Sequence, residues 1–282
     1  FHQWIRNAFK SNMPYDQFVR SILTSTESVK ESPPSQWYAE VRYLDRYVDD
    51  TAQLFLGLRI GCARCHHHPF EKFSQDDYFG LAAFFGRVGR SGGTGGSERA
   101  SNESIYVKAT GEVKHPVTGK TVLPRGLGAE PLEIPPCDDP RGRLVDWMTE
   151  PNNPYFAKAF VNRLWAHFFG RGLVDPLDDM RATNPPSNPE LLNALAQHFI
   201  EGGYRVRPVI RTILNSSTYQ LSSRLAPQQL PAAADPARYF TTPGIRLLSA
   251  EQILDAISMA TSIPEVFPGY PPGTTAVSLA EG

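Results

Sequence analysis

Apolar residues recur at steps of three and four along most of the chain, a spacing that predicts a mainly α-helical protein. Within residues 1–90 the spacing predicts two short helices near the start and a longer helix over about 40–60. A further helix is expected to begin at Asp76 or Asp77, because aspartate is a common N-cap residue.

The same spacing returns after residue 138, where polar residues or prolines precede each apolar run. Asp, Asn and Ser are favoured N-caps, and proline is favoured at the first helical position. The predicted helix starts are Asp138 or Asp139 with Pro140, Asn153 with Pro154, Asn188 with Pro189, Pro208, and Ser249.

Between these two helical regions lies the one clear β signal. Short runs of β-branched and aromatic residues at 104–107, 113 and 121–123 alternate with Thr-Gly turns, which predicts a small β-meander around 104–123. We therefore expect two packed helical regions, 1–90 and 138–282, joined by a Gly/Pro-rich linker at 91–137 that carries the meander. Packing of the two regions is expected because the aromatic residues would otherwise be excessively exposed.

The charge balance excludes one broad class of function. The 28 Lys and Arg residues nearly equal the 29 Asp and Glu residues, so bulk charge gives no reason to expect nucleic-acid binding. No apolar run approaches the ~20 residues that a membrane helix needs, so no transmembrane segment is expected.

The densest chemical signal is Cys62-Ala63-Arg64-Cys65-His66, the attachment pattern of c-type haem. On a helical turn, residues three and four apart share a face, so Cys62, Cys65 and His66 are expected to point the same way. The two thiols would then reach the two vinyl groups of haem, and the imidazole would reach the iron. The sequence leaves the sixth iron ligand open; the distant candidates are Met148, Met180, His167 and His198.

Two other interpretations of this motif remain open. Cys62 and Cys65 with two of His66, His67 and His68 would supply four ligands for Zn or another divalent metal, with Cys137, His115, His167 or His198 as distant partners. Alternatively, Cys62 and Cys65 form a local disulfide in a scaffold or interaction module, which leaves Cys137 unpaired. Elsewhere, Asp175, Asp178, Asp179 and Arg181 are close in sequence, and we expect a solvated turn with local salt bridges rather than a calcium site. Asn162, Arg163, Trp165 and His167 fall on one predicted helix, where Trp165 is expected in the core.

Several exact strings together resemble a known family. They are NMPYDQF at 12–18, CARCHHHPFE at 62–71 and DYFGLAAFF at 77–85 in the first region, and VNRLWAH at 161–167, GRGLV at 170–174, NPPSNP at 184–189 and STYQLSS at 217–223 in the second. The first set resembles the planctomycete cytochrome-like domain of unknown function 1549. The second set resembles its usual companion, domain of unknown function 1553.

The resemblance implies a periplasmic or secreted protein whose relatives often carry an export signal and an upstream cytochrome domain. That domain, or another redox protein, is the implied partner. It also implies that residues 1–90 are the C-terminal part of the 1549-type domain and that 138–282 are the N-terminal part of the 1553-type domain. The family usually has Asn or Asp in place of His67, which leaves Cys62, Cys65, His66 and His68 as the matching residues.

The sequence therefore predicts an extracytoplasmic c-type-cytochrome-like protein with a redox or electron-transfer role. In this interpretation Cys62 and Cys65 hold haem c, and His66 is the proximal ligand. The alternatives are a structural or hydrolytic metal protein and a secreted scaffold. No particular reaction or substrate follows from the residues.

Overall fold

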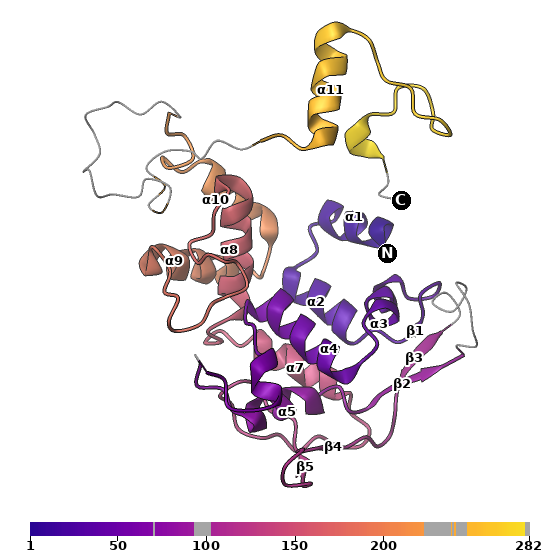
Figure 1. Ribbon diagram of the computed structural model, residues 1–282, viewed down its shortest axis with the longest axis vertical. Helices are drawn as coiled ribbons and strands as arrows, with labels where there is room; N and C mark the ends of the chain where they lie inside the picture. The colour runs from indigo at the N-terminus through magenta and orange to yellow at the C-terminus, as the bar shows by residue number, and fades with distance from the viewer. Residues whose placement is uncertain (70, 93–102, 223–237, 239, 241–246, 280–282) are drawn as a thin grey trace.

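Helices dominate the computed structural model, which describes residues 1–69, 71–92, 103–222, 238, 240 and 247–279 (Figure 1). The helices are α1 (His2–Lys10), α2 (Tyr15–Leu23), α3 (Gln36–Glu40), α4 (Leu44–Thr51), α5 (Gln75–Ala83), α7 (Pro140–Met148), α8 (Phe156–Phe169), α9 (Pro189–Glu201), α10 (Val206–Leu214) and α11 (Ala250–Thr261). The strands are β1 (Glu27–Ser28), β2 (Val88–Ser91), β3 (Ser104–Val107), β4 (Val113–Lys114) and β5 (Thr121–Val122). The predicted mainly α fold with a small β insertion is confirmed.

Most of the predicted helix starts in the second region are confirmed by side-chain caps. The Asp139 side chain accepts from the backbone N–H of Arg141 at the start of α7, and the Asn188 side chain caps α9 in the same way. Asn153 Oδ1 accepts from two backbone N–H groups just before α8, and Ser249 caps α11. These oxygens satisfy N–H groups that have no partner inside the helix.

Two predicted starts are wrong by a few residues. The N-cap of α5 is Ser74, whose hydroxyl accepts from the Asp77 backbone N–H while the Asp77 carboxylate accepts from the Ser74 backbone N–H. Asp77 is therefore the third helical residue of a capping box rather than the cap itself. α10 begins at Val206, and Pro208 lies within its first turn, where the missing N–H of proline costs no hydrogen bond.

The predicted helix over about 40–60 is shorter in the structure, where it begins at Leu44 and ends at Gly57. α4 continues into a π-helical turn, Ala52–Leu56, and the chain then leaves the helix at Gly57, whose φ is 68°. Glycine suits this left-handed position, where Met180 and Ala159 also approach closely and the Met180 backbone N–H donates to the Gly57 carbonyl at 2.9 Å. The Cys-x-x-Cys-His motif consequently lies after this helix, on a separate short turn.

The predicted single meander is wrong in its pairing. β3 pairs antiparallel with both β2 and β1, so that residues 27–28 and 88–91 complete a three-stranded sheet in the order β1-β3-β2. β4 and β5 form a separate hairpin with Val113 opposite Val122. β2 lies in a Gly-rich stretch that carries little strand signal, which is why the sequence pattern did not indicate it.

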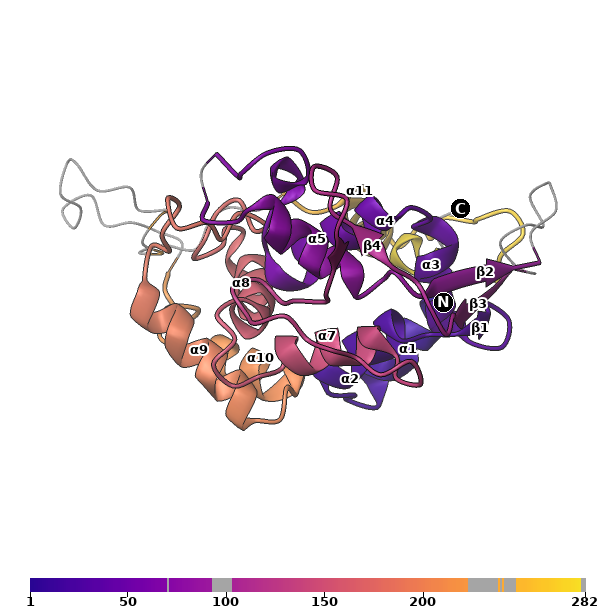
Figure 2. The same cartoon turned by 90° about the horizontal axis from the view of Figure 1, so that it is seen from below.

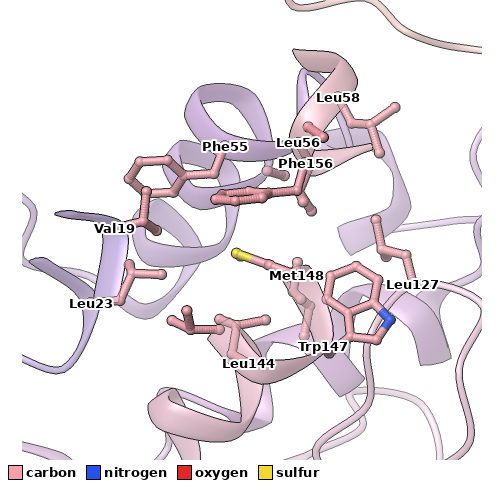
Figure 3. Packing of buried hydrophobic residues seen from close by; sticks show 14 of the residues in the cluster. Val19, Leu23, Phe55, Leu56, Leu58, Leu127, Leu144, Trp147, Met148 and Phe156 are labelled. Carbon is pink, nitrogen blue, oxygen red and sulfur yellow. The ribbon is translucent and has the colours of Figure 1, made fainter. Parts of the chain in front are cut away.

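One hydrophobic core joins the two helical regions, as predicted. Its buried residues come from both, and Figure 3 shows Val19 and Leu23 of α2 facing Leu144 and Met148 of α7, with Phe156 of α8 above them. In Figure 2 the helices lie in two rows, with α1, α2, α7, α9 and α10 in one and α3, α4 and α5 in the other. None of the helices in the described part of the chain is long and apolar enough to cross a membrane.

α11 differs from the other long helices because none of its residues is buried. It stands apart from the helices of the core in Figure 1 and is joined to the short helix Ala276–Ser278, whose backbone N–H groups at Ala276 and Val277 donate to Asp255.

Candidate functional site

The motif occupies a 3₁₀ turn, Gly61–Arg64, that follows the core helix α4 and its π-helical extension. Ala63 is fully buried and anchors the turn, whereas Cys62, Cys65 and His66 are exposed. The backbone N–H groups of Cys65 and His66 both face the Cys62 carbonyl, at 3.3 and 3.4 Å. The predicted single turn therefore exists, and it presents two free thiols and an imidazole to solvent.

Charged and polar contacts hold this turn against α4 and α5. The Arg64 guanidinium pairs with the Asp45 carboxylate, and the Arg64 carbonyl accepts from Gln75 Nε2 at 3.0 Å. A hydrogen bond with the Cys65 side chain and the charge of Asp45 raise the pKa of Arg64 above its ordinary value. The Cys65 side chain thus lies beside a permanent cation.

The three histidines after Cys65 have different environments. The ring Nδ1 of His66 lies 2.6 Å from the carbonyl of His67. Because a carbonyl can only accept, Nδ1 carries a proton in this contact, and in the neutral ring Nε2 then keeps its lone pair. The ring Nε2 of His68 lies 3.0 Å from the carbonyl of Arg59, so the same reasoning assigns the proton of His68 to Nε2. His67 is exposed.

A second contact ties this segment to the other helical region. The Arg59 guanidinium makes two hydrogen bonds to Asp178, at 2.6 and 2.9 Å, and Gln53 donates to the same carboxylate. These bonds, the one from Arg59 first, hold the pKa of Asp178 below its ordinary value. Asp178 therefore holds Arg59 in place, and the Arg59 carbonyl is the group that faces the His68 ring.

Asp178→Asn is expected to lower the free energy of unfolding by about 1 kcal/mol at neutral pH, since a two-bond Arg–carboxylate pair near the surface is lost. A lowered folded-state pKa stabilises the fold above the unfolded value of ~3.9, and that stabilisation disappears as the pH falls through the folded-state pKa. Urea unfolding at pH 7 and pH 3 should therefore show the two proteins converging at low pH.

Asp175→Asn is the matched control, because Asp175 contacts Arg171 at 3.4 Å and its side chain is 45% exposed. It should change stability far less. Equal losses in both variants at pH 7 would contradict the importance of the Arg59–Asp178 pair.

The other acidic residues of this segment form ion pairs, as expected. Asp179 pairs with Arg181 at 3.2 Å. The partner of Asp178 is not local, however, because Arg59 lies far from it in sequence. In the part of the chain that the structure describes, no group of three or more His, Cys, Asp or Glu side chains is placed to hold a metal ion.

The four residues of the zinc alternative are thus not gathered around one point among the described residues. The same holds for the distant partners considered with them. His115 is buried beside Asp76 at 3.6 Å, the His198 ring contacts the Thr212 hydroxyl, and Cys137 is an exposed free thiol next to Asp138. Haem attachment requires only His66 to reach a metal, so this finding does not bear on it.

The candidates for a sixth ligand are also dispersed. Met148 is fully buried in the core (Figure 3), so its sulfur is not accessible to an iron held at the exposed motif turn. His167 is exposed on α8 with its ring against Phe168. Met180 packs beside Gly57 and lines a cavity. Trp165 is buried, so its predicted core role is confirmed, and Asn162 proves to be a buried structural residue.

No pattern in the sequence indicates this cavity, which has a volume of about 770 Å³. It lies between the loop that follows the motif, at Pro69, Glu71 and Lys72, and the first turns of α8 and α9. Its lining comes from segments far apart in the chain, and none of them carries a motif of its own. The strings NPPSNP and HPFE, which carry part of the family resemblance, lie on opposite sides of the cavity, but nothing in the sequence places them together.

Comparison with known proteins identifies the two regions. Residues 1–90 match the family PSCyt2, a protein of unknown function (DUF1549), and residues 140–272 match PSD1, a protein of unknown function (DUF1553). These two matches, in this order, confirm the resemblance to the planctomycete cytochrome-like families. The comparisons with curated proteins and with solved structures found no match.

Proposed function

We propose that this chain is an extracytoplasmic haem-binding protein in which Cys62 and Cys65 attach haem c and His66 is the proximal iron ligand. The observation that carries the proposal is the state of the His66 ring. Its Nδ1 donates to the His67 carbonyl, so the Nε2 lone pair is available to a metal. Metal-bound histidines commonly have this arrangement, in which the second ring nitrogen donates to a carbonyl and fixes the tautomer.

The donor set also fits the chemistry of attachment. Two exposed free thiols and this imidazole occupy one turn, and exposure is what covalent attachment to vinyl groups requires. Bound haem would supply one-electron redox chemistry, tuned by its axial ligands and surroundings. The chain's own contribution is to hold the turn, through buried Ala63 and the Arg64–Asp45 pair, and to fix the proton on Nδ1 of His66.

The proposal includes a location and a domain division. Thioether attachment takes place outside the cytoplasm, and the family names suggest secreted planctomycete proteins. We assign the attachment turn to a domain at 1–90, followed by the linker at 91–137 and a second domain at 138–282. An upstream cytochrome domain or another redox protein is the proposed partner.

The test is to export the chain in a bacterial host that has the c-type haem attachment machinery and to record its absorption spectrum and denatured mass. We expect a Soret band and a covalent mass increment of one haem. The Cys62→Ser/Cys65→Ser double variant should lose both signals. His66→Ala should change the spectrum, because the proximal ligand is removed.

Cys137→Ser and His67→Ala are the matched controls. The first removes an exposed thiol outside the motif, and the second keeps the His67 carbonyl that faces His66. Both should retain the covalent haem. A colourless protein would overturn the proposal; stoichiometric zinc lost to a chelator would then favour the metal alternative, and a two-proton mass change on reduction would favour the disulfide scaffold.

A further inference from the structure

The cavity beside the motif loop is built from both helical regions. Pro69, Glu71 and Lys72 form one side, and the segment Met180–Pro186 with the starts of α8 and α9 forms the other. The Glu71 carboxylate accepts from the Ala182 backbone N–H at 2.6 Å, which fastens the two sides together. A volume of about 770 Å³ is within the range of small-molecule sites.

The charges around the cavity are mainly positive. Lys72, Lys158 and Arg181 line it, against the single carboxylate of Glu71. Arg181 is paired with Asp179, and Glu71 is engaged with the backbone. The side chains of Lys72 and Lys158, in contrast, make no ion pair or hydrogen bond within the described ranges. Two ammonium groups are therefore left to balance a negative charge in the cavity.

Two helices begin at the cavity. It is lined by Tyr155 and Lys158 at the start of α8, and by Pro189 and Leu192 at the start of α9. The Asn153 and Asn188 side chains already accept from the first N–H groups of these helices, so the lysine side chains are the groups that would hold an anion.

The remaining lining is apolar or uncharged. Val174 and Leu192 are buried, Met180 is partly buried, and several prolines complete the lining. Burial and the nearby charges of Glu71 and Asp77 raise the pKa of Tyr155, so its phenol stays protonated and able to donate. A ligand that fits must combine an apolar body with a negative group.

We infer that this cavity binds a small organic carboxylate, with the carboxylate between Lys72 and Lys158 and the apolar body against Val174, Met180 and Leu192. The inference rests on the cavity alone and does not depend on haem attachment at Cys62 and Cys65. It adds a ligand site that spans the two family regions.

The test is titration calorimetry of the full chain with three probes: benzoate, its neutral counterpart benzyl alcohol, and inorganic sulfate. We expect saturable binding of benzoate, with benzyl alcohol and sulfate at least tenfold weaker. Each of Lys72→Met and Lys158→Met should weaken benzoate binding by about tenfold, the effect of one charge-assisted hydrogen bond. Lys120→Met, on the exposed β4–β5 hairpin, is the matched control and should bind as the parent protein does.

Three results would overturn the inference. They are the absence of saturable benzoate binding, unchanged benzoate affinity in the Lys72→Met/Lys158→Met double variant, and sulfate binding as tight as that of benzoate, which would mean that the site recognises charge alone. Thermal unfolding of each variant confirms that it is folded. Spectra of the same samples report haem separately, so failure of one proposal leaves the other measurable.

Discussion

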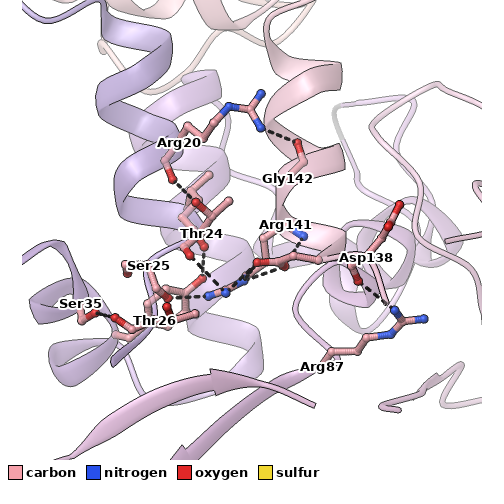
Figure 4. A network of polar contacts seen from close by, with 12 residues as sticks. Arg20, Thr24, Ser25, Thr26, Ser35, Arg87, Asp138, Arg141 and Gly142 are labelled. Carbon is pink, nitrogen blue, oxygen red and sulfur yellow. Dashed lines mark hydrogen bonds and ion pairs between the residues drawn. The ribbon is translucent and has the colours of Figure 1, made fainter. Parts of the chain in front are cut away.

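Arg141→Ala is expected to lower the free energy of unfolding by about 3–5 kcal/mol, the range for breaking a buried ion pair by removing one partner. The Arg141 side chain is 1% exposed and pairs with Asp139 at 2.8 Å. It also donates to the carbonyls of Thr24 and Ser25, just after the end of α2, at 3.4 and 3.0 Å (Figure 4). Its guanidinium lies 5.3 Å from the centre of the Tyr38 ring.

These contacts explain why the loss should be large. The last carbonyls of a helix have no partner within it, and a cation at this end is also favoured by the helix dipole. Removing Arg141 leaves a buried carbonyl at Ser25 unpaired, opens a cavity beside Tyr38 and removes one of the contacts between α2 and α7. Hydrogen bonds with Asp139 and the nearby Tyr38 keep the pKa of Arg141 above its ordinary value despite burial, so it stays charged at any ordinary pH.

Urea unfolding followed by circular dichroism measures this effect. Arg143→Ala is the matched control on the same helix: Arg143 pairs with Asp138 at 3.0 Å, but its side chain is 53% exposed, so at most about 1 kcal/mol should be lost. If Arg141→Ala were as stable as Arg143→Ala, the buried Arg141 network would not be the strong contact between α2 and α7 that its burial implies.

Asn162→Leu is expected to cost about 2–4 kcal/mol, because it leaves two buried backbone groups without partners. Asn162 is fully buried on α8, where its Nδ2 donates to the Val174 carbonyl at 2.8 Å and its Oδ1 accepts from the Val174 N–H at 2.9 Å. The Asn162 side-chain amide thus makes the two hydrogen bonds that a neighbouring β-strand would otherwise make with the Val174 backbone. Gly172 allows this close approach, since a Cβ there would lie 2.2 Å from the Val174 carbonyl oxygen.

The matched control is Asn152→Leu, at an exposed position before α8, which should change stability by no more than about 0.5 kcal/mol. Chemical unfolding again gives the values. Because Val174 also lines the cavity, Asn162→Leu should in addition weaken benzoate binding, whereas Asn152→Leu should not. Unchanged stability in Asn162→Leu would show that the segment around Val174 does not depend on this amide.

Local signals in the sequence were sufficient to predict most of the helices. Asp139, Asn188 and Ser249 cap helices where the pattern placed them, because an N-cap depends only on residues within one turn. The pairing of β3 with β2 and β1 was not predictable in this way, since it joins residues far apart in the chain. The helix predicted over 40–60 ends at Gly57, where Met180 of the other region packs against it, and this contact likewise joins residues far apart in the chain.

The candidate site shows the same limit. The motif residues lie on one turn because Cys62, Cys65 and His66 are close in sequence. The roles of the two histidine rings depend on the carbonyls of His67 and Arg59, which spacing does not reveal. The basic cavity was missed because Lys72 and Lys158 are brought together only by the tertiary fold.

The shared core has a consequence for how this architecture is inherited. α2 buries Val19 and Leu23 against Leu144 and Met148 of α7. Either family region expressed without the other would therefore expose a large apolar surface. A chimeric protein that kept only one region would need polar substitutions over the whole of that apolar contact surface. The two regions are therefore expected to be inherited together, as one folding unit.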